Sequence, residues 1–145
     1  MNSAAAAALF EEQTKYVEGD VVALRKWRVF SRAFPILDVA FEADRRVPLR
    51  VRMDCEDWNE LPPRVALLNL DGALLTKVPT GPPSIFHQGP HPVTGRPFVC
   101  MAGTREYHTH TNHTSDLWDN YKTRSGYELG GILTQIWSGW LKSNP

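Results

Sequence analysis

The sequence has little cysteine: Cys55 and Cys100 are its only thiols in 145 residues. So few cysteines exclude a scaffold held together by disulfides, and a chain of this length buries enough surface to fold without one. Long hydrophobic runs are also absent, whereas a helix that crosses a bilayer needs about 20 apolar residues. Residues 1–8 lack the basic segment of a secretory signal. We therefore expect a single cytoplasmic domain spanning residues 1–145, with both thiols free.

An excess of charge is missing as well. Sixteen basic and sixteen acidic residues give a formal net charge of +0 at pH 7. This balance provides no general attraction to nucleic acid or to an anionic membrane surface, so neither is expected as a partner. The hydrophobic fraction of 42% and the charged fraction of 22% are those of an ordinary globular domain.

The first third of the chain predicts a helix followed by strands. Residues 4–17 are rich in alanine, Ser3 can cap a helix there, and Gly19 can end it. Four segments that follow have the short, alternating pattern of strands, and turn signals separate them. They are residues 27–32, 37–42, 49–54 and 64–69. We expect them to form an antiparallel meander. Arg50 and Arg52 would share its outer face, which would be either solvated or a docking face for an acidic or small-protein partner.

The remainder predicts a loop and a second helix. Residues 77–97 hold six of the eleven prolines and should form an irregular, stiff loop. From Leu129 to Leu141 hydrophobic residues recur at helical spacing, and Ser125 and Glu128 have the spacing of a capping box at the start. An amphipathic helix packed on the inner face of the sheet follows. The expected fold class is therefore α+β.

Histidine is concentrated in one stretch. All five histidines and Cys100 lie in residues 87–113. Imidazole and thiol are the side chains that titrate or bind metals near neutral pH, so their concentration predicts a chemical site. The histidines are His87, His91, His108, His110 and His113.

The order of the elements, together with short motifs, resembles the ubiquitin-conjugating fold. Residues 60–65 (ELPPRV) resemble the double-proline turn that leads into that family's fourth strand. Residues 91–93 (His-Pro-Val) resemble a His-Pro-Asn motif that precedes the family's catalytic cysteine, which here would be Cys100. Trp118 would be a displaced counterpart of a family tryptophan. Val93 departs from the motif's asparagine, so another donor, Asn112 or a histidine, would have to replace its amide.

A second resemblance is closer. Cys100, Glu106, His108 and either His110 or His113 resemble the Cys-Glu-His-His pattern of a bacterial family described as a predicted metal-binding domain. This resemblance implies the conjugating component of a bacterial ubiquitin-like system, of the BilB type, implicated in antiviral defence. Its partners would be a ubiquitin-like protein, an activating enzyme and a protein substrate.

The implied activity is that of a transferase without a cofactor. Cys100 would carry the ubiquitin-like C-terminus as a thioester and pass it to an amine, because a thiolate is a strong nucleophile and a thioester is reactive. An imidazolium at His91 or His108 would raise the thiolate fraction of Cys100. Glu106, His108 and His113 are the available acid–base groups.

Two other interpretations stay open. Cys100, Glu106, His108 and His113 carry zinc-ligand chemistry, which would make the protein a zinc-binding domain or a metal-dependent enzyme. Alternatively, the protein is a non-catalytic binding module of the same fold, with Val93 in its favour. At single positions, His87 and His91 could merely anchor the loop, and Cys55 is expected to be inert.

Overall fold

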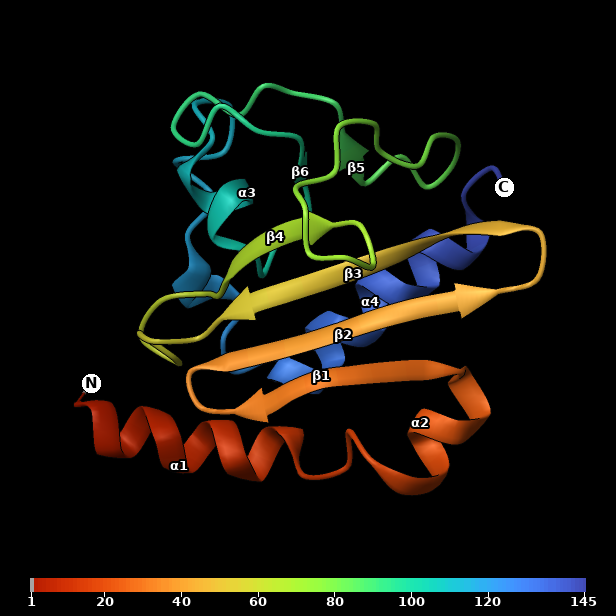
Figure 1. The fold of residues 1–145 in the computed structure, drawn as a ribbon. Helices are drawn as coiled ribbons and strands as arrows, with labels where there is room; N and C mark the ends of the chain where they lie inside the picture. The colour runs from red at the N-terminus through yellow and green to blue at the C-terminus, as the bar shows by residue number, and fades with distance from the viewer. Residues whose placement is uncertain (1) are drawn as a thin grey trace.

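The computed structural model describes residues 2–145 and confirms the α+β class (Figure 1). Helices and strands follow the predicted order, with three short helices and two short strands added. The elements are α1 (Ser3–Thr14), α2 (Gly19–Arg25), β1 (Trp27–Ala33), β2 (Ile36–Ala43), β3 (Arg46–Asp54), β4 (Arg64–Leu68), β5 (Phe86–His87), β6 (Phe98–Val99), α3 (Arg105–Thr109), the 3-10 helix η1 (Trp118–Asn120) and α4 (Leu129–Lys142). None of the helices in residues 2–145 has the length and apolarity that a membrane crossing requires.

The four long strands form the expected antiparallel meander, in the order β1-β2-β3-β4. Val51 pairs with Val39 in β2 and with Leu67 in β4, so these three side chains share the inner face. β4 is an edge strand of this sheet, and α3 lies beside it (Figure 1). β5 and β6 form a separate two-stranded ladder, in which Phe86 pairs with Val99.

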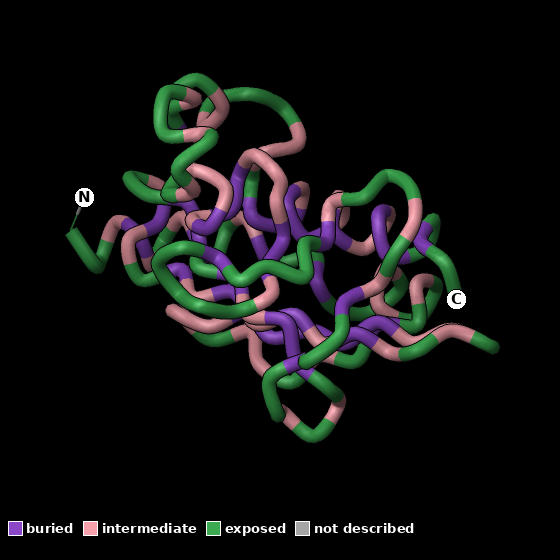
Figure 2. Tube along the Cα trace, turned by 90° about the horizontal axis from the view of Figure 1, so that it is seen from above, coloured by how far each residue is buried: buried purple, intermediate pink, exposed green. Residues whose placement is uncertain are grey.

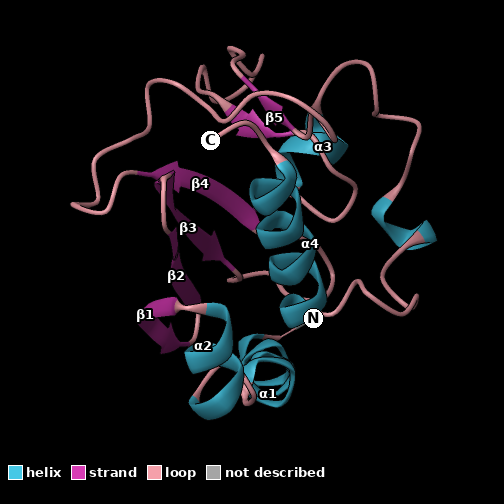
Figure 3. Cartoon of the chain, turned by 90° about the vertical axis from the view of Figure 1, so that its right-hand side faces the viewer, coloured by secondary structure: helices cyan, strands magenta, loops and turns pink. Residues whose placement is uncertain are grey.

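The hydrophobic core lies between the inner face of the sheet and α4, which crosses that face (Figure 3). The buried stretches of chain gather in the middle of the molecule (Figure 2). Leu129, Ile132, Leu133, Ile136 and Trp140 of α4 are buried, as their helical spacing predicted. The C-terminal helix is therefore confirmed as amphipathic and core-facing.

The outer face of the sheet holds a buried ion pair. Asp38 in β2 is almost fully buried, and its two carboxylate oxygens accept hydrogen bonds of 2.8 Å from Arg50. Arg52 donates to the same carboxylate at 3.0 Å. The two guanidinium groups lower the pKa of Asp38 against the opposing effect of its burial. Arg50 is thus committed to the protein itself, while the side chain of Arg52 stays 41% exposed.

Two expectations about helix ends were wrong. Asn2, not Ser3, caps α1, with Oδ1 accepting from the Ala5 N–H at 2.8 Å. Gly19 does not end a helix: it begins α2 in a left-handed conformation, with φ of 58°. Glycine is favoured there because a side chain would be strained at this φ.

The predicted capping box of α4 does not form. Glu128 is itself the N-cap residue, and its carboxylate accepts from the Gly126 N–H instead of an N–H of Ser125. The first helical N–H, that of Leu129, donates to Oε1 of Gln13 in α1 at 3.1 Å. The same oxygen accepts from the buried Trp58 indole at 3.1 Å. One side chain of α1 therefore satisfies donors from two other segments.

Candidate active site around Cys100

Cys100 directly follows β6, and the backbone fixes its position. Its N–H donates to the Ile85 carbonyl at 2.7 Å, which extends the β5–β6 ladder by one residue. The side chain is half-buried. Cys55, by contrast, is buried in the hydrophobic core, and burial raises the pKa of its thiol far above the ordinary value. Cys100 is therefore the thiol available for chemistry, and Cys55 has the inert setting predicted for it.

His113 is the histidine that the structure places against this thiol. Its Nε2 lies 3.6 Å from Sγ of Cys100, within reach of an S–H···N hydrogen bond. The imidazole stacks on the ring of Tyr107, with centroids 4.2 Å apart and planes 12° apart. This stacking limits the rotation of His113 and keeps its Nε2 directed at the sulfur.

Asp116 holds Tyr107 in that position. Its Oδ2 accepts two phenolic hydrogen bonds, at 2.6 Å from Tyr107 and at 2.7 Å from Tyr121. These two hydrogen bonds lower the pKa of Asp116, and the carboxylate in turn raises the pKa of both phenols. Cys100, His113, Tyr107 and Asp116 therefore form a continuous chain of contacts from thiol to carboxylate.

His91 serves the loop instead of the thiol. It is 1% exposed, and its Nε2 donates to the Glu106 carbonyl at 2.8 Å. Its Nδ1 accepts from the N–H groups of Val93 and Thr94. Both ring nitrogens of His91 are thus bonded to backbone groups of the loop and of α3, and neither is bonded to Cys100. The expectation that His91 could anchor the proline-rich loop is met. The Val93 side chain, in place of the motif's asparagine, is 74% exposed and contributes no donor.

His108 is also occupied by the backbone. Its Nδ1 donates to the Asp116 carbonyl at 2.7 Å, and its Nε2 accepts from the Gly103 N–H at 3.0 Å. Burial lowers the pKa of His108, which favours the neutral ring. Both ring nitrogens of His108 are thus bonded to backbone groups and neither is bonded to Cys100. His108 fixes the segment that carries Asp116.

Glu106 faces away from the pair. Its Oε1 accepts from the Val65 N–H at 2.9 Å, on the edge of β4. Burial raises the pKa of Glu106 from 4.5 to about 7, against the opposing effects of the hydrogen bond from the Val65 N–H and, more weakly, of the charges on Arg105 and Arg64. Glu106 thus binds the edge of β4. Among the described residues it makes no hydrogen bond to Cys100.

The two remaining histidines, His87 and His110, lie beside Phe98 together with His91. The rings of His87, His91 and His110 lie 5.3, 4.9 and 5.7 Å from that of Phe98. His110 also lies 5.7 Å from His113, because the chain turns between them and the His113 N–H donates to the His110 carbonyl. The cluster along the sequence is therefore split into a group around Phe98 and a pair around Tyr107.

The predicted zinc ligands do not converge. Within residues 2–145, no group of three or more histidine, cysteine, aspartate or glutamate side chains is arranged to hold a metal ion. Cys100 and His113 are paired, while Glu106 and His108 bind backbone groups elsewhere. The donor set Cys100/Glu106/His108/His113 therefore does not fit a zinc centre in this arrangement.

The thiol itself is less acidic than expected. Burial raises the pKa of Cys100, and no neighbouring charge lowers it. At neutral pH the sulfur is protonated and needs a base. His113 is the group placed to act as that base.

Sequence reasoning missed Asp116 and Tyr121 and gave Tyr107 no firm role. They lie in or beside a polar stretch without periodicity, where nothing in the pattern distinguishes one aspartate from another. The available signal was aromatic: Tyr107 and Tyr121 flank a segment with five charged or histidine side chains, which are His108, His110, His113, Asp116 and Asp119.

Comparison with known protein families places part of the chain beside one family. No curated protein matches the chain. The model of the Y4jH-like family, described as the Y4jH family, matches residues 86–143, which is less than half of the chain. The matched span begins at β5 and ends just after α4, so it contains Cys100, Tyr107, His113 and Asp116. The part of the chain that carries the candidate site is thus similar to the Y4jH-like family.

Proposed function

We propose that the protein is a conjugating enzyme of a bacterial ubiquitin-like system, in which Cys100 carries the C-terminus of a ubiquitin-like protein as a thioester. The observation that carries this proposal is the pair formed by a half-buried thiol and an imidazole nitrogen 3.6 Å from it. A nucleophile beside a base that a third group orients is the arrangement that acyl transfer requires. The helix–meander–helix order agrees with the conjugating fold that the sequence resembles.

The first step is transfer between two thiols. His113 accepts the thiol proton while Sγ of Cys100 attacks the carbonyl of the thioester on the activating enzyme. A new carbon–sulfur bond forms, the activating enzyme's sulfur leaves, and the proton returns to that sulfur. The raised pKa of Cys100 is compatible with this step, because a thiolate of higher pKa is intrinsically the stronger nucleophile.

The second step releases the carried protein to an amine. The amine nitrogen attacks the Cys100 thioester carbonyl, the amine proton passes to His113, and Cys100 leaves with its carbon–sulfur bond broken. His113 then protonates the departing sulfur. One residue pair thus serves both halves of the transfer.

Reconstitution with ATP, a cognate ubiquitin-like protein and its activating enzyme tests the proposal. The wild-type protein should gain an adduct, measured by intact mass, that a thiol reductant releases. Cys100→Ser should form a reductant-resistant ester and Cys100→Ala no adduct, whereas Cys55→Ala is the matched control and should behave like wild type. An adduct on Cys100→Ala would contradict the proposal.

Two results would redirect the assignment. Binding of the ubiquitin-like protein without an adduct on Cys100 would select the non-catalytic binding module. Stoichiometric zinc in the purified protein, lost when Glu106, His108 and His113 are replaced, would select the metal-binding alternative and would require a rearrangement of these side chains.

A further inference from the structure

A cavity of about 370 Å³ lies at the β4 edge of the sheet, away from the hydrogen bonds of Cys100. Its walls come from Arg52 and Asp54 of β3, from the edge strand β4, from Leu74 and Leu75, from residues 94–97, and from Glu106 of α3. Val65, Leu74 and Pro97 supply an apolar part of the lining. Small-molecule sites usually have this size and this mixture of apolar walls and a few polar groups.

Three arginines from three segments line the cavity: Arg52 of β3, Arg64 of β4 and Arg96 of the loop. Their donors are only partly used. Arg52 bonds Asp38 through Nε, and Arg64 lies 3.7 Å from Asp54, with half of its side chain exposed. The guanidinium of Arg96 has no partner among the described residues. Guanidinium groups with free donors match the oxygens of a phosphate or carboxylate.

Glu106 is the buried polar group of this cavity. It is 6% exposed, and it lines the cavity while Oε1 accepts from the Val65 N–H. Burial keeps this carboxyl protonated over a wider pH range than usual, with a pKa of about 7. A protonated carboxyl repels no anion and can donate a hydrogen bond. Asp54 is the remaining acidic group in the lining, and Arg64 pairs with it.

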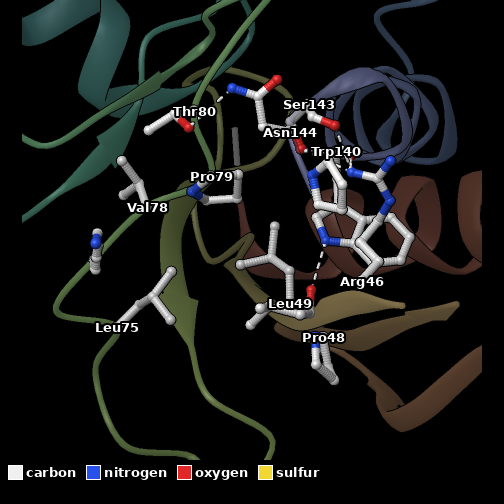
Figure 4. A pocket seen from close by; sticks show the side chains of 13 residues that line it. Arg46, Pro48, Leu49, Leu75, Val78, Pro79, Thr80, Trp140, Ser143 and Asn144 are labelled. Carbon is white, nitrogen blue, oxygen red and sulfur yellow. Dashed lines mark hydrogen bonds between the residues drawn. The ribbon is translucent and has the colours of Figure 1, made fainter. Parts of the chain in front are cut away.

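A second cavity, of about 350 Å³, lies near the C-terminus and differs in its polar groups (Figure 4). There, Arg46 donates to the carbonyls of Trp140 and Ser143, and the Trp140 indole donates to the Val47 carbonyl. Asn144 is bonded to Thr80. These donors tie the end of α4 to the sheet and the loop. They are therefore less available to a ligand than the donors of the β4-edge cavity.

We propose that the β4-edge cavity binds a small phosphate monoester, with Arg52, Arg64 and Arg96 on the phosphate and the apolar lining against the esterified group. Three guanidinium groups from separate segments suit the three terminal oxygens of a tetrahedral phosphate better than the two oxygens of a planar carboxylate. The cavity volume suits a small molecule. This site is independent of the Cys100 chemistry, since none of its residues contacts the Cys100–His113 pair through a hydrogen bond.

Calorimetric titration of the full chain with phenyl phosphate, at constant ionic strength and pH 6.5, tests the proposal. Arg96→Ala and Arg64→Ala should each weaken binding by about tenfold, because each removes a charge-assisted contact. Arg28→Ala is the matched control: it removes an exposed, ion-paired arginine from β1 and should leave the affinity unchanged. Amide NMR shifts should localise binding to residues 64–67 and 94–96.

Four results would overturn the proposal. They are no binding of phenyl phosphate, equal weakening by the Arg28 control, tighter binding of succinate than of phenyl phosphate, and much tighter binding of a phosphoserine peptide, which would make the site a peptide-binding surface. The Glu106→Gln variant keeps the proposal falsifiable if an arginine variant misfolds. This variant should retain its affinity at pH 6.5 and lose little of it at pH 8, whereas wild type should lose affinity at pH 8. If the variant shows the same pH dependence as wild type, the role of Glu106 is contradicted.

Discussion

At the scale of single residues, the five candidate catalytic side chains have separate roles. His113 contacts the thiol of Cys100, whereas His91 and His108 use both ring nitrogens on backbone groups. Glu106 is committed to the β4 edge. Residue type alone could not separate these roles, because an imidazole that catalyses and an imidazole that anchors a loop look the same in a sequence. The distinction comes from the partner of each nitrogen.

Glu106 predicts a pH dependence of stability. Its pKa is about 7 in the folded protein and near 4.5 when unfolded, so the folded state favours the protonated form. Its contribution to the free energy of unfolding is fully present below pH 4.5 and is lost as pH rises through 7, by up to about 3 kcal/mol. Chemical denaturation at pH 5 and pH 8 measures this loss.

Glu106→Gln is the informative variant for that prediction. The amide keeps an acceptor oxygen for the Val65 N–H but carries no charge, so the fall in stability between pH 5 and pH 8 should be clearly smaller than in wild type. Equal pH dependence of the two proteins would show that ionisation of Glu106 is not the cause.

At the scale of elements, the side-chain amide of Gln13 links α1 to the first residue of α4. Gln13 accepts from the Leu129 N–H and from the Trp58 indole, and both donors would lose this acceptor without it. Gln13→Ala should therefore lower the free energy of unfolding by about 1–3 kcal/mol. Ser125→Ala, at the position of the predicted capping box, should change it by less than about 0.5 kcal/mol. Thermal and urea denaturation of both variants provide the measurement. A larger loss of stability for Ser125→Ala than for Gln13→Ala would indicate that the capping box does form.

The strands and α4 were predictable because their patterns are local. Hydrophobic alternation fixes which face of β3 is buried, and helical spacing does the same for α4. The short helix α3 was not predictable in this way. Successive residues of a helix point about 100° apart, so Glu106, Tyr107 and His108 face the β4 edge, His113 and Gly103 respectively. Five residues are too few to show that period in a sequence.

At the scale of the whole molecule, the site depends on contacts between distant segments. Ile85 fixes the backbone of Cys100 across the proline-rich loop, and Asp116 reaches Tyr107 from beyond a turn. Turns of this kind leave no periodic signal, which is why Asp116 and Tyr121 could not be identified from the sequence. The stretch containing all five histidines contains the candidate site, but only the folded chain shows which of them faces the thiol.

If His113 is the base for Cys100, the alkylation rate of that thiol depends on His113. Iodoacetamide labelling from pH 6 to 10 is followed by peptide mass analysis. An ordinary thiol has a pKa of about 8.5. The labelling rate of Cys100 should still rise above pH 8.5, because burial raises its pKa. His113→Gln should slow labelling at pH 7.5 by on the order of tenfold. The ring of His110 accepts a hydrogen bond from the Asn112 N–H, so His110→Gln should not slow labelling. Equal rates in wild type and His113→Gln, with Cys55 unlabelled in both, would contradict the account.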